Sequence, residues 1–178
     1  AQTLTQIGLA AFVLDPFGPR GITSTVTNQT LYSFAASAYD VLAALRVLAD
    51  HPRIDALRIG AQGHSRGGSA VLMAASEKFA SPVLGQGPRL RAVLAGYPWS
   101  GHQFLNPTVG QTIVHVMMGD RDGWCSPQQV QGHVQAIRLA GGAATMRLFA
   151  GAAHSFDRGT AVTSIADAAV SPGAPTAY

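Results

Sequence analysis

The sequence contains few charged residues, one lysine and one cysteine. Charged side chains make up 12% of the 178 residues, whereas about 25% is usual in soluble domains. This low share indicates either many buried strands or surfaces that are covered in an intact assembly. Cys125 is the single cysteine, which excludes an internal disulfide and a zinc site built from cysteines. Because 47% of the residues are hydrophobic, residues 1–178 are expected to form the core of a single domain.

Long apolar segments and clusters of positive charge are also missing. The net charge is +3, but the basic residues are scattered and do not interleave with aromatic residues, so we expect no nucleic-acid binding. The richest apolar stretch, 31–48, contains Asp40 and Arg46, so no membrane association is expected either. The chain opens at Ala1 without a signal-peptide pattern, which leaves its true start and its compartment, cytoplasmic or exported, open.

Motifs for metals and cofactors are absent too. No two histidines stand four residues apart beside clustered carboxylates, and no phosphate-binding loop occurs. The glycines at 60 and 63 do not form a dinucleotide-binding fingerprint. We therefore expect neither a metal nor a cofactor.

Apolar runs alternate with helical patterns along the chain. Segments in which apolar residues recur at three- and four-residue steps or follow helix-start signals predict helices at 31–49, from 69 to about 79, and from 127 to about 139. Continuous apolar runs predict strands at 8–14, 56–61, 90–95, 112–118 and 144–149. Strands separated by helices of this length indicate an α/β fold, with a mostly parallel sheet and helices on both of its faces.

The most informative motif follows the second of these runs. Residues 63–67 read Gly63-His64-Ser65-Arg66-Gly67, which places a serine in a glycine frame between a strand and a helix. A side chain raised on a sharp turn is expected to leave no room for a Cβ two residues before or after it. The helix that follows directs its free amides toward Ser65. Ser65 is therefore the candidate nucleophile.

A serine hydroxyl needs a base, and in parallel α/β folds reactive groups follow strands. His154 lies five residues beyond the strand that ends at Phe149 and is the candidate base, with His102 as its rival. We expect the remaining histidines at positions outside the site. His115 is expected in the core, His51 and His133 on the surface, and His64 pointing away from the neighbouring serine.

The candidate acid follows the strand at 112–118. Asp122 is preferred because two more loop residues carry it over the strand end, whereas Asp120 can instead hydrogen-bond its own backbone. Cys125 is interpreted as a lone, partly buried thiol, with a second nucleophile as the alternative. The resulting chain order of nucleophile, acid and base is the order found in α/β-hydrolases.

Four stretches extend this order into a family resemblance: 15–21, the serine turn, 119–127 and 151–157. With the intervening strands they make nearly the whole chain resemble the dienelactone hydrolase branch of the α/β-hydrolase fold. That branch carries cysteine at the nucleophile position, so Ser65 makes the chain more similar to its serine esterases. The resemblance supports Asp122 over Asp120, because the family's acid stands three residues after the glycine at the equivalent of Gly119.

The resemblance also implies what precedes and follows the chain. The five predicted strands resemble the fourth to the eighth of a full α/β-hydrolase, so the fold is expected to lack the first three strands and one loop of the oxyanion hole. The other oxyanion donor is then the backbone amide of Arg66. An unpaired sheet edge would result. We expect either pairing of 8–14 with 56–61 or a homo-oligomer formed through the exposed edge.

The functional expectation is a serine hydrolase that cleaves small-molecule carboxylic esters through an acyl-enzyme. The alternative is a catalytically impaired fragment with an inactive or binding role. Arg20 and Arg158 are candidates for holding a substrate carboxylate, although a solvated arginine is an equal reading of Arg158. Tyr97, Trp99 and Trp124 follow strands and are candidates for an apolar substrate pocket, with core packing as the alternative for each.

Overall fold

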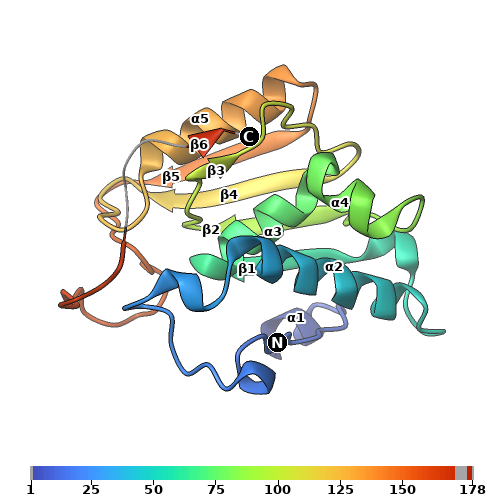
Figure 1. Cartoon of the computed structure of the whole chain (residues 1–178), viewed down its shortest axis with the longest axis horizontal. Coiled ribbons are helices and arrows are strands. Elements are labelled where there is room, and N and C mark those ends of the chain that lie inside the picture. The colour runs from blue at the N-terminus through green and yellow to red at the C-terminus, as the bar shows by residue number, and fades with distance from the viewer. Residues whose placement is uncertain (1, 171–175, 178) are drawn as a thin grey trace.

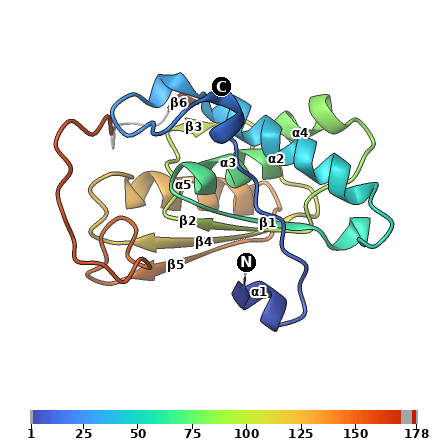
Figure 2. The same cartoon turned by 90° about the horizontal axis from the view of Figure 1, so that it is seen from below.

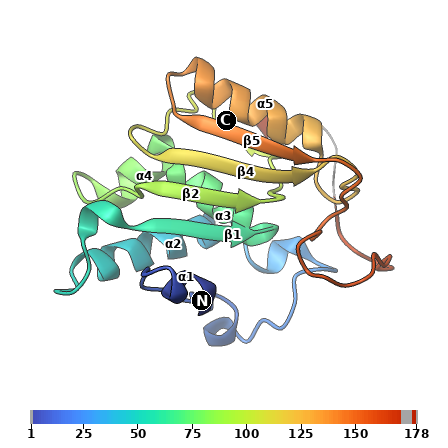
Figure 3. The same cartoon turned by 180° about the vertical axis from the view of Figure 1, so that it is seen from behind.

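A parallel four-stranded sheet forms the centre of the protein (Figure 1). The computed structural model describes residues 2–170 and 176–177. The sheet contains β1 (Gly60–His64), β2 (Ala92–Gly96), β4 (Ile113–Gly119) and β5 (Ala144–Phe149), in the order β1-β2-β4-β5. All four strands run in the same direction, so their carboxyl ends and the loops that follow them lie on the same side of the sheet, its carboxyl edge (Figures 1 and 3).

Four helices cover one face of this sheet, whereas helices were expected on both (Figure 2). They are α2 (Phe34–Ala49), α3 (Arg66–Ala75), α4 (Glu77–Leu84) and α5 (Pro127–Leu139). In the part of the chain described, only the short α1 (Gln2–Gln6) lies on the other side (Figures 2 and 3). None of the described helices has the length and hydropathy that crossing a membrane requires.

Helix boundaries follow from capping residues in the sequence. The side chain of Ser33 accepts a hydrogen bond from the Ala36 amide at the start of α2, and Ser126 does the same at the start of α5, where Pro127 occupies the first turn. The predicted helix from 69 begins three residues earlier and is interrupted at Ser76, which separates α3 from α4.

The core lies between the sheet and the four helices. Alternate residues of β4, among them Val114, Val116 and Met118, are fully buried beneath the helices. Leu42 and Leu45 bury the apolar face of α2 against the same cluster. Each such side chain contributes about 1.5–3 kcal/mol when fully buried, so this layer fixes the position of the strand ends.

Short elements complete the described part. Three single turns of 3₁₀ helix occur at η1 (Gly18–Arg20), η2 (Gln29–Leu31) and η3 (Ala56–Arg58), and β3 (His102–Gln103) pairs in parallel with β6 (Thr176–Ala177). The predicted strand at 56–61 is therefore partly wrong. The Asp55 side chain accepts a hydrogen bond from the Leu57 amide and starts η3, so β1 begins only at Gly60.

The predicted strand at 8–14 is wrong. This run is irregular, and Phe12 and Val13 are 62% and 74% exposed. Pairing between 8–14 and 56–61 is likewise wrong, because β1 is the terminal strand of the described sheet and pairs with β2 alone. An apolar run indicates side chains that can be buried, whereas a strand also needs a partner with free backbone groups. β1 thus forms one edge of the sheet, and association through this edge stays a prediction.

Candidate active site

Ser65 stands on the turn between β1 and α3 in a conformation that non-glycine residues rarely adopt. Its backbone has φ 54° and ψ −119°. Such backbone strain costs roughly 1–3 kcal/mol and persists only where neighbouring contacts hold it. The Ser65 amide donates to the Gly96 carbonyl at the end of β2, at 2.9 Å. The turn therefore raises the serine side chain above the carboxyl edge of the sheet.

Glycines surround this turn for different reasons. A Cβ on Gly63 would lie 2.1 Å from the carbonyl oxygen of Gly67, which confirms that this position has no room for a side chain. A Cβ on Gly67 would meet nothing within 4 Å, so the expectation of a second crowded position there is wrong. The crowded neighbour is Gly68, whose Cβ would lie 2.7 Å from the Gly96 carbonyl oxygen. Close helix–strand packing, rather than the serine turn, requires that glycine.

The structure brings Ser65, His154 and Asp122 together from the loops after β1, β5 and β4. His154 Nε2 lies 2.9 Å from Ser65 Oγ, and His154 Nδ1 lies 2.7 Å from Asp122 Oδ2. The side chains of His154 and Asp122 are only 11% and 0% exposed. Water therefore competes little for these hydrogen bonds.

The orientation of the imidazole follows from the bonds of Asp122. The second oxygen, Oδ1, accepts hydrogen bonds from the amides of Trp124 and Cys125, at 2.8 and 2.9 Å. The carboxylate is thus held as an acceptor, so it receives the Nδ1 proton of His154. Nε2 is left with its lone pair toward the Ser65 hydroxyl, which is the arrangement that a general base needs.

Asp120, the alternative acid, has another partner. Its Oδ1 accepts a hydrogen bond from the Gly151 amide at 2.7 Å, which ties the loop after β4 to the loop after β5. The sequence had suggested that Asp120 would bond its own backbone. Asp120 instead fixes the start of the loop that carries His154, and Asp122 is the aspartate beside the imidazole.

Two aromatic residues enclose the His154 ring. Trp124 stacks on it, with ring centroids 5.1 Å apart and an angle of 17° between the ring planes. Tyr97 meets it edge-on at 4.9 Å. These contacts restrict rotation of the imidazole and shield it from water. Both residues were predicted to line a substrate pocket, and the structure places both beside the candidate base.

The remaining histidines have other contacts, and the ring of His64, which precedes Ser65 in the chain, contacts Tyr97 and Asp157. His102 packs against Trp99 and Phe34. His115 is half-buried in β4, where its Nδ1 lies 2.6 Å from the Thr145 hydroxyl, so it is less buried than expected. His133 was predicted on the surface, but this is wrong. It is 8% exposed, and burial lowers its pKa to about 4.

Arg66 occupies the first position of α3, directly after Ser65. The first amides of a helix have no partner within the helix, so the Arg66 amide is available where an oxyanion would form. Its guanidinium donates instead to the Tyr32 and Gln29 carbonyls and to the Thr25 hydroxyl. Desolvation lowers the pKa of Arg66. The side chain thus fastens residues 25–32 to the start of α3.

Two other candidate substrate residues, Arg20 and Trp99, contact side chains of α2. Arg20 pairs with Asp40 at 2.9 Å and lies over the Tyr32 ring. Trp99 stacks on Phe34 and lines a small cavity between α2, α3 and α5. Arg158 is exposed, and within residues 2–170 and 176–177 no ion pair of its guanidinium is found.

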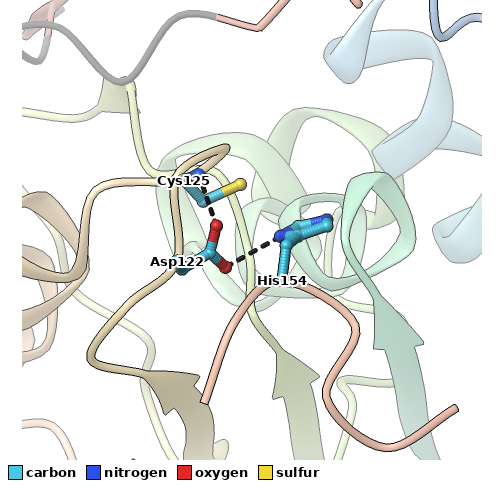
Figure 4. Close-up of side chains that lie close together, drawn as sticks. All are labelled: Asp122, Cys125 and His154. Atoms are coloured by element: carbon cyan, nitrogen blue, oxygen red, sulfur yellow. Dashed lines mark hydrogen bonds and ion pairs between the residues drawn. The ribbon is translucent and has the colours of Figure 1, made fainter. Parts of the chain in front are cut away.

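Cys125 is buried beside the same group (Figure 4). Its thiol could join Asp122 and His154 as a metal ligand, since the three ligand atoms lie within 4.8 Å of one another. Both oxygens of Asp122 and both nitrogens of His154 already make hydrogen bonds, however. Burial, and secondarily Asp122, raises the pKa of the Cys125 thiol. The Asp122–His154 pair therefore fits an oriented acid–base pair better than a metal site. Cys125 fits a buried thiol better than a nucleophile.

A parallel sheet with a strained serine turn after one strand, and with an aspartate and a histidine after two later strands, is the arrangement of the α/β-hydrolase fold. Within that fold the chain belongs to the dienelactone hydrolase family, whose model matches residues 20–172. None of the curated proteins matches the chain at a significant level.

Solved structures with this fold include esterase 2 of the planctomycete Thermogutta terrifontis. Its propionate-bound form has a TM-score of 0.55 and 19% identity over 71% of this chain, and its apo form has a TM-score of 0.57 and 17% identity over 70%. Dipeptidyl peptidase 4 of Porphyromonas gingivalis gives a TM-score of 0.57 and 18% identity over 72% of this chain and 21% of its own. The chain spans 57% of the length of both esterase structures.

Proposed function

We propose that this chain carries the catalytic machinery of a serine hydrolase that cleaves carboxylic esters of small molecules through an acyl-enzyme. One observation carries the proposal: the imidazole of His154 bridges the hydroxyl of Ser65 and the carboxylate of Asp122 through hydrogen bonds of 2.9 and 2.7 Å. Membership of the dienelactone hydrolase family and the likeness to an esterase support it.

In the proposed mechanism Ser65 Oγ attacks the ester carbonyl carbon while its proton passes to His154 Nε2. Throughout the reaction Asp122 accepts the hydrogen bond that His154 Nδ1–H donates, and its carboxylate stabilises the imidazolium that forms. The negative charge on the carbonyl oxygen develops near the start of α3, where the Arg66 amide donates to it. One such donor typically contributes about 10²–10³ in rate.

The intermediate collapses when the ester C–O bond breaks and the alcohol leaves with the proton from His154 Nε2. A water molecule then attacks the acyl carbon and transfers its proton to the same nitrogen. The second collapse releases the carboxylic acid and restores the Ser65 hydroxyl. This chemistry requires no cofactor.

Turnover of p-nitrophenyl acetate tests the proposal. We expect Ser65→Ala to lower kcat/KM at least about 10³-fold with an unchanged thermal midpoint. Ser81→Ala is the matched control, because Ser81 is an exposed serine of α4 whose hydroxyl bonds Glu77. Full turnover by Ser65→Ala would overturn the nucleophile assignment. A folded wild-type protein without turnover would favour the inactive or binding role.

A further inference from the structure

Asp157 connects the loop after β5, on which it lies, with the loop after β2 and the end of β1, although it is not one of the three central residues. It lies three residues beyond His154 on the loop after β5. Its Oδ1 accepts a hydrogen bond from the Tyr97 hydroxyl at 2.7 Å, and its Oδ2 lies 3.4 Å from His64 Nε2. One carboxylate therefore contacts the loop after β2 and the end of β1.

Tyr97 transmits this contact to the imidazole. Its ring packs edge-on against His154, at 4.9 Å, and against Phe156, at 5.7 Å. The residue is buried, and its amide donates to the Met117 carbonyl of β4 at 2.6 Å. The ring is thus fixed at its backbone by the sheet and at its hydroxyl by Asp157. Burial, with the bond to Asp157, raises the pKa of Tyr97 to about 12, so the hydroxyl remains a donor.

The backbone on both sides of this contact is strained. Tyr97 has φ 36° and Ser155, the residue after His154, has φ 59°. Left-handed conformations of non-glycine residues cost roughly 1–3 kcal/mol each and need surrounding contacts to persist. The Tyr97–Asp157 bond joins these two strained segments directly. His64, at the other carboxylate oxygen, immediately precedes Ser65.

We propose that Asp157 is a positioning residue that holds the His154 loop against the Ser65 turn, acting through the hydroxyl of Tyr97. The inference rests on the proposed function. Asp157 does not touch the reacting atoms; its carboxylate keeps the Tyr97 ring against the imidazole, so that Nε2 stays within hydrogen-bonding distance of Ser65 Oγ. A displacement of about 1 Å at such a base can cost up to about 10²-fold in rate.

Three variants separate positioning from mere stability. Asp157→Ala and Tyr97→Phe each remove the bond, and we expect each to lower kcat for p-nitrophenyl acetate about tenfold, with KM within about twofold. Asp157→Asn keeps an acceptor for the Tyr97 hydroxyl and should retain kcat within about threefold. The double variant Tyr97→Phe/Asp157→Ala should lose less than the product of the two single losses, because both single variants remove the Tyr97–Asp157 bond.

Asp50→Ala, an exposed carboxylate at the end of α2, is the control and should match the wild type. Thermal midpoints and labelling of Ser65 by a fluorophosphonate accompany each kcat. Additive losses in the double variant, or unchanged kcat in Asp157→Ala and Tyr97→Phe, would overturn the positioning role. An equal loss in Asp157→Asn would also overturn it, because the acceptor would then not matter. A wild-type protein that takes no label would instead refute the proposed function.

Discussion

The loops at the carboxyl ends of the strands and the segment 2–33, which contains only α1 and two turns of 3₁₀ helix, differ in their surroundings. Around the site, Asp122 accepts three hydrogen bonds and is fully buried, and Trp124 and Tyr97 pack on His154. In the segment 2–33, large apolar side chains such as Phe12 and Val13 are mostly exposed. An irregular segment is fixed by the partners it finds within the chain, not by its own apolar content.

Arg66 links these two regions. Its backbone belongs to the start of α3 beside Ser65, and its guanidinium holds the carbonyls of Gln29 and Tyr32. Residues 25–32 are therefore tied to the start of α3, whereas residues 7–14 form no helix or strand. Substitutions in the serine turn and at Arg66 test this difference between the two regions.

The largest effect is expected at the serine turn. Gly63→Ala places a Cβ 2.1 Å from the Gly67 carbonyl oxygen, a backbone atom that cannot move aside. We expect a loss of more than about 4 kcal/mol in the free energy of unfolding, or no folded protein. Urea denaturation measures it. Gly67→Ala is the matched control, since its Cβ meets nothing within 4 Å, and equal damage from both variants would contradict the account.

Removing the link should release the segment without unfolding the sheet. Arg66→Met keeps the backbone amide but loses the bonds to Thr25, Gln29 and Tyr32, which leaves the partly buried carbonyls of Gln29 and Tyr32 without these donors. We expect a loss of about 2–3 kcal/mol and faster amide hydrogen exchange at 25–32, with exchange in β4 unchanged. For comparison, Arg20→Met breaks a partly exposed ion pair with Asp40 and should lower the free energy of unfolding much less than Arg66→Met does.

Uniform exchange rates across 25–32 and β4 in Arg66→Met would contradict the separation of the two regions. Unchanged amide hydrogen exchange at 25–32 in Arg66→Met would contradict it as well.

A smaller, pH-dependent effect should come from the helical layer. Burial lowers the pKa of His133 to about 4, below the 6.5 of an unfolded chain. The neutral form is therefore preferred in the folded state, and this contribution is complete above pH 6.5 and is lost as the pH falls toward 4. Linkage gives roughly 2 kcal/mol of lost stability at pH 5. His133→Gln should flatten the dependence of the free energy of unfolding on pH between pH 6.5 and 5. Substitution of the exposed His51 by Gln should leave this dependence unchanged.

Much of the sheet could be predicted from the sequence. The apolar runs at 112–118 and 144–149 match β4 and β5 to within one residue, because these buried strands are bounded by turn residues. The meeting of Ser65, Asp122 and His154 also follows from the parallel topology, which brings the carboxyl ends of the strands to one edge. Their catalytic roles remain the proposal made above.

Other features depend on contacts between distant segments. The run at 8–14 has strand-like composition, but pairing requires a neighbour that local sequence does not reveal. The burial of His133 depends on the segment after β2, whose Ser100 hydroxyl lies 3.4 Å from His133 Nδ1, and the polar residues next to His133 in the sequence do not indicate it. Asp157 was missed because its role arises only when the Tyr97 hydroxyl reaches it from 60 residues away. The crowding at Gly68 likewise depends on the close approach of β2.

The most direct test of the central claim is the site of covalent labelling by a fluorophosphonate. Trypsin cleavage after Arg58 and Arg66 releases residues 59–66, in which Ser65 is the only hydroxyl-bearing residue. We predict that the intact protein takes one label, that this peptide carries it, and that Ser65→Ala takes none. A label on any other peptide, or none on a folded protein, would contradict the account.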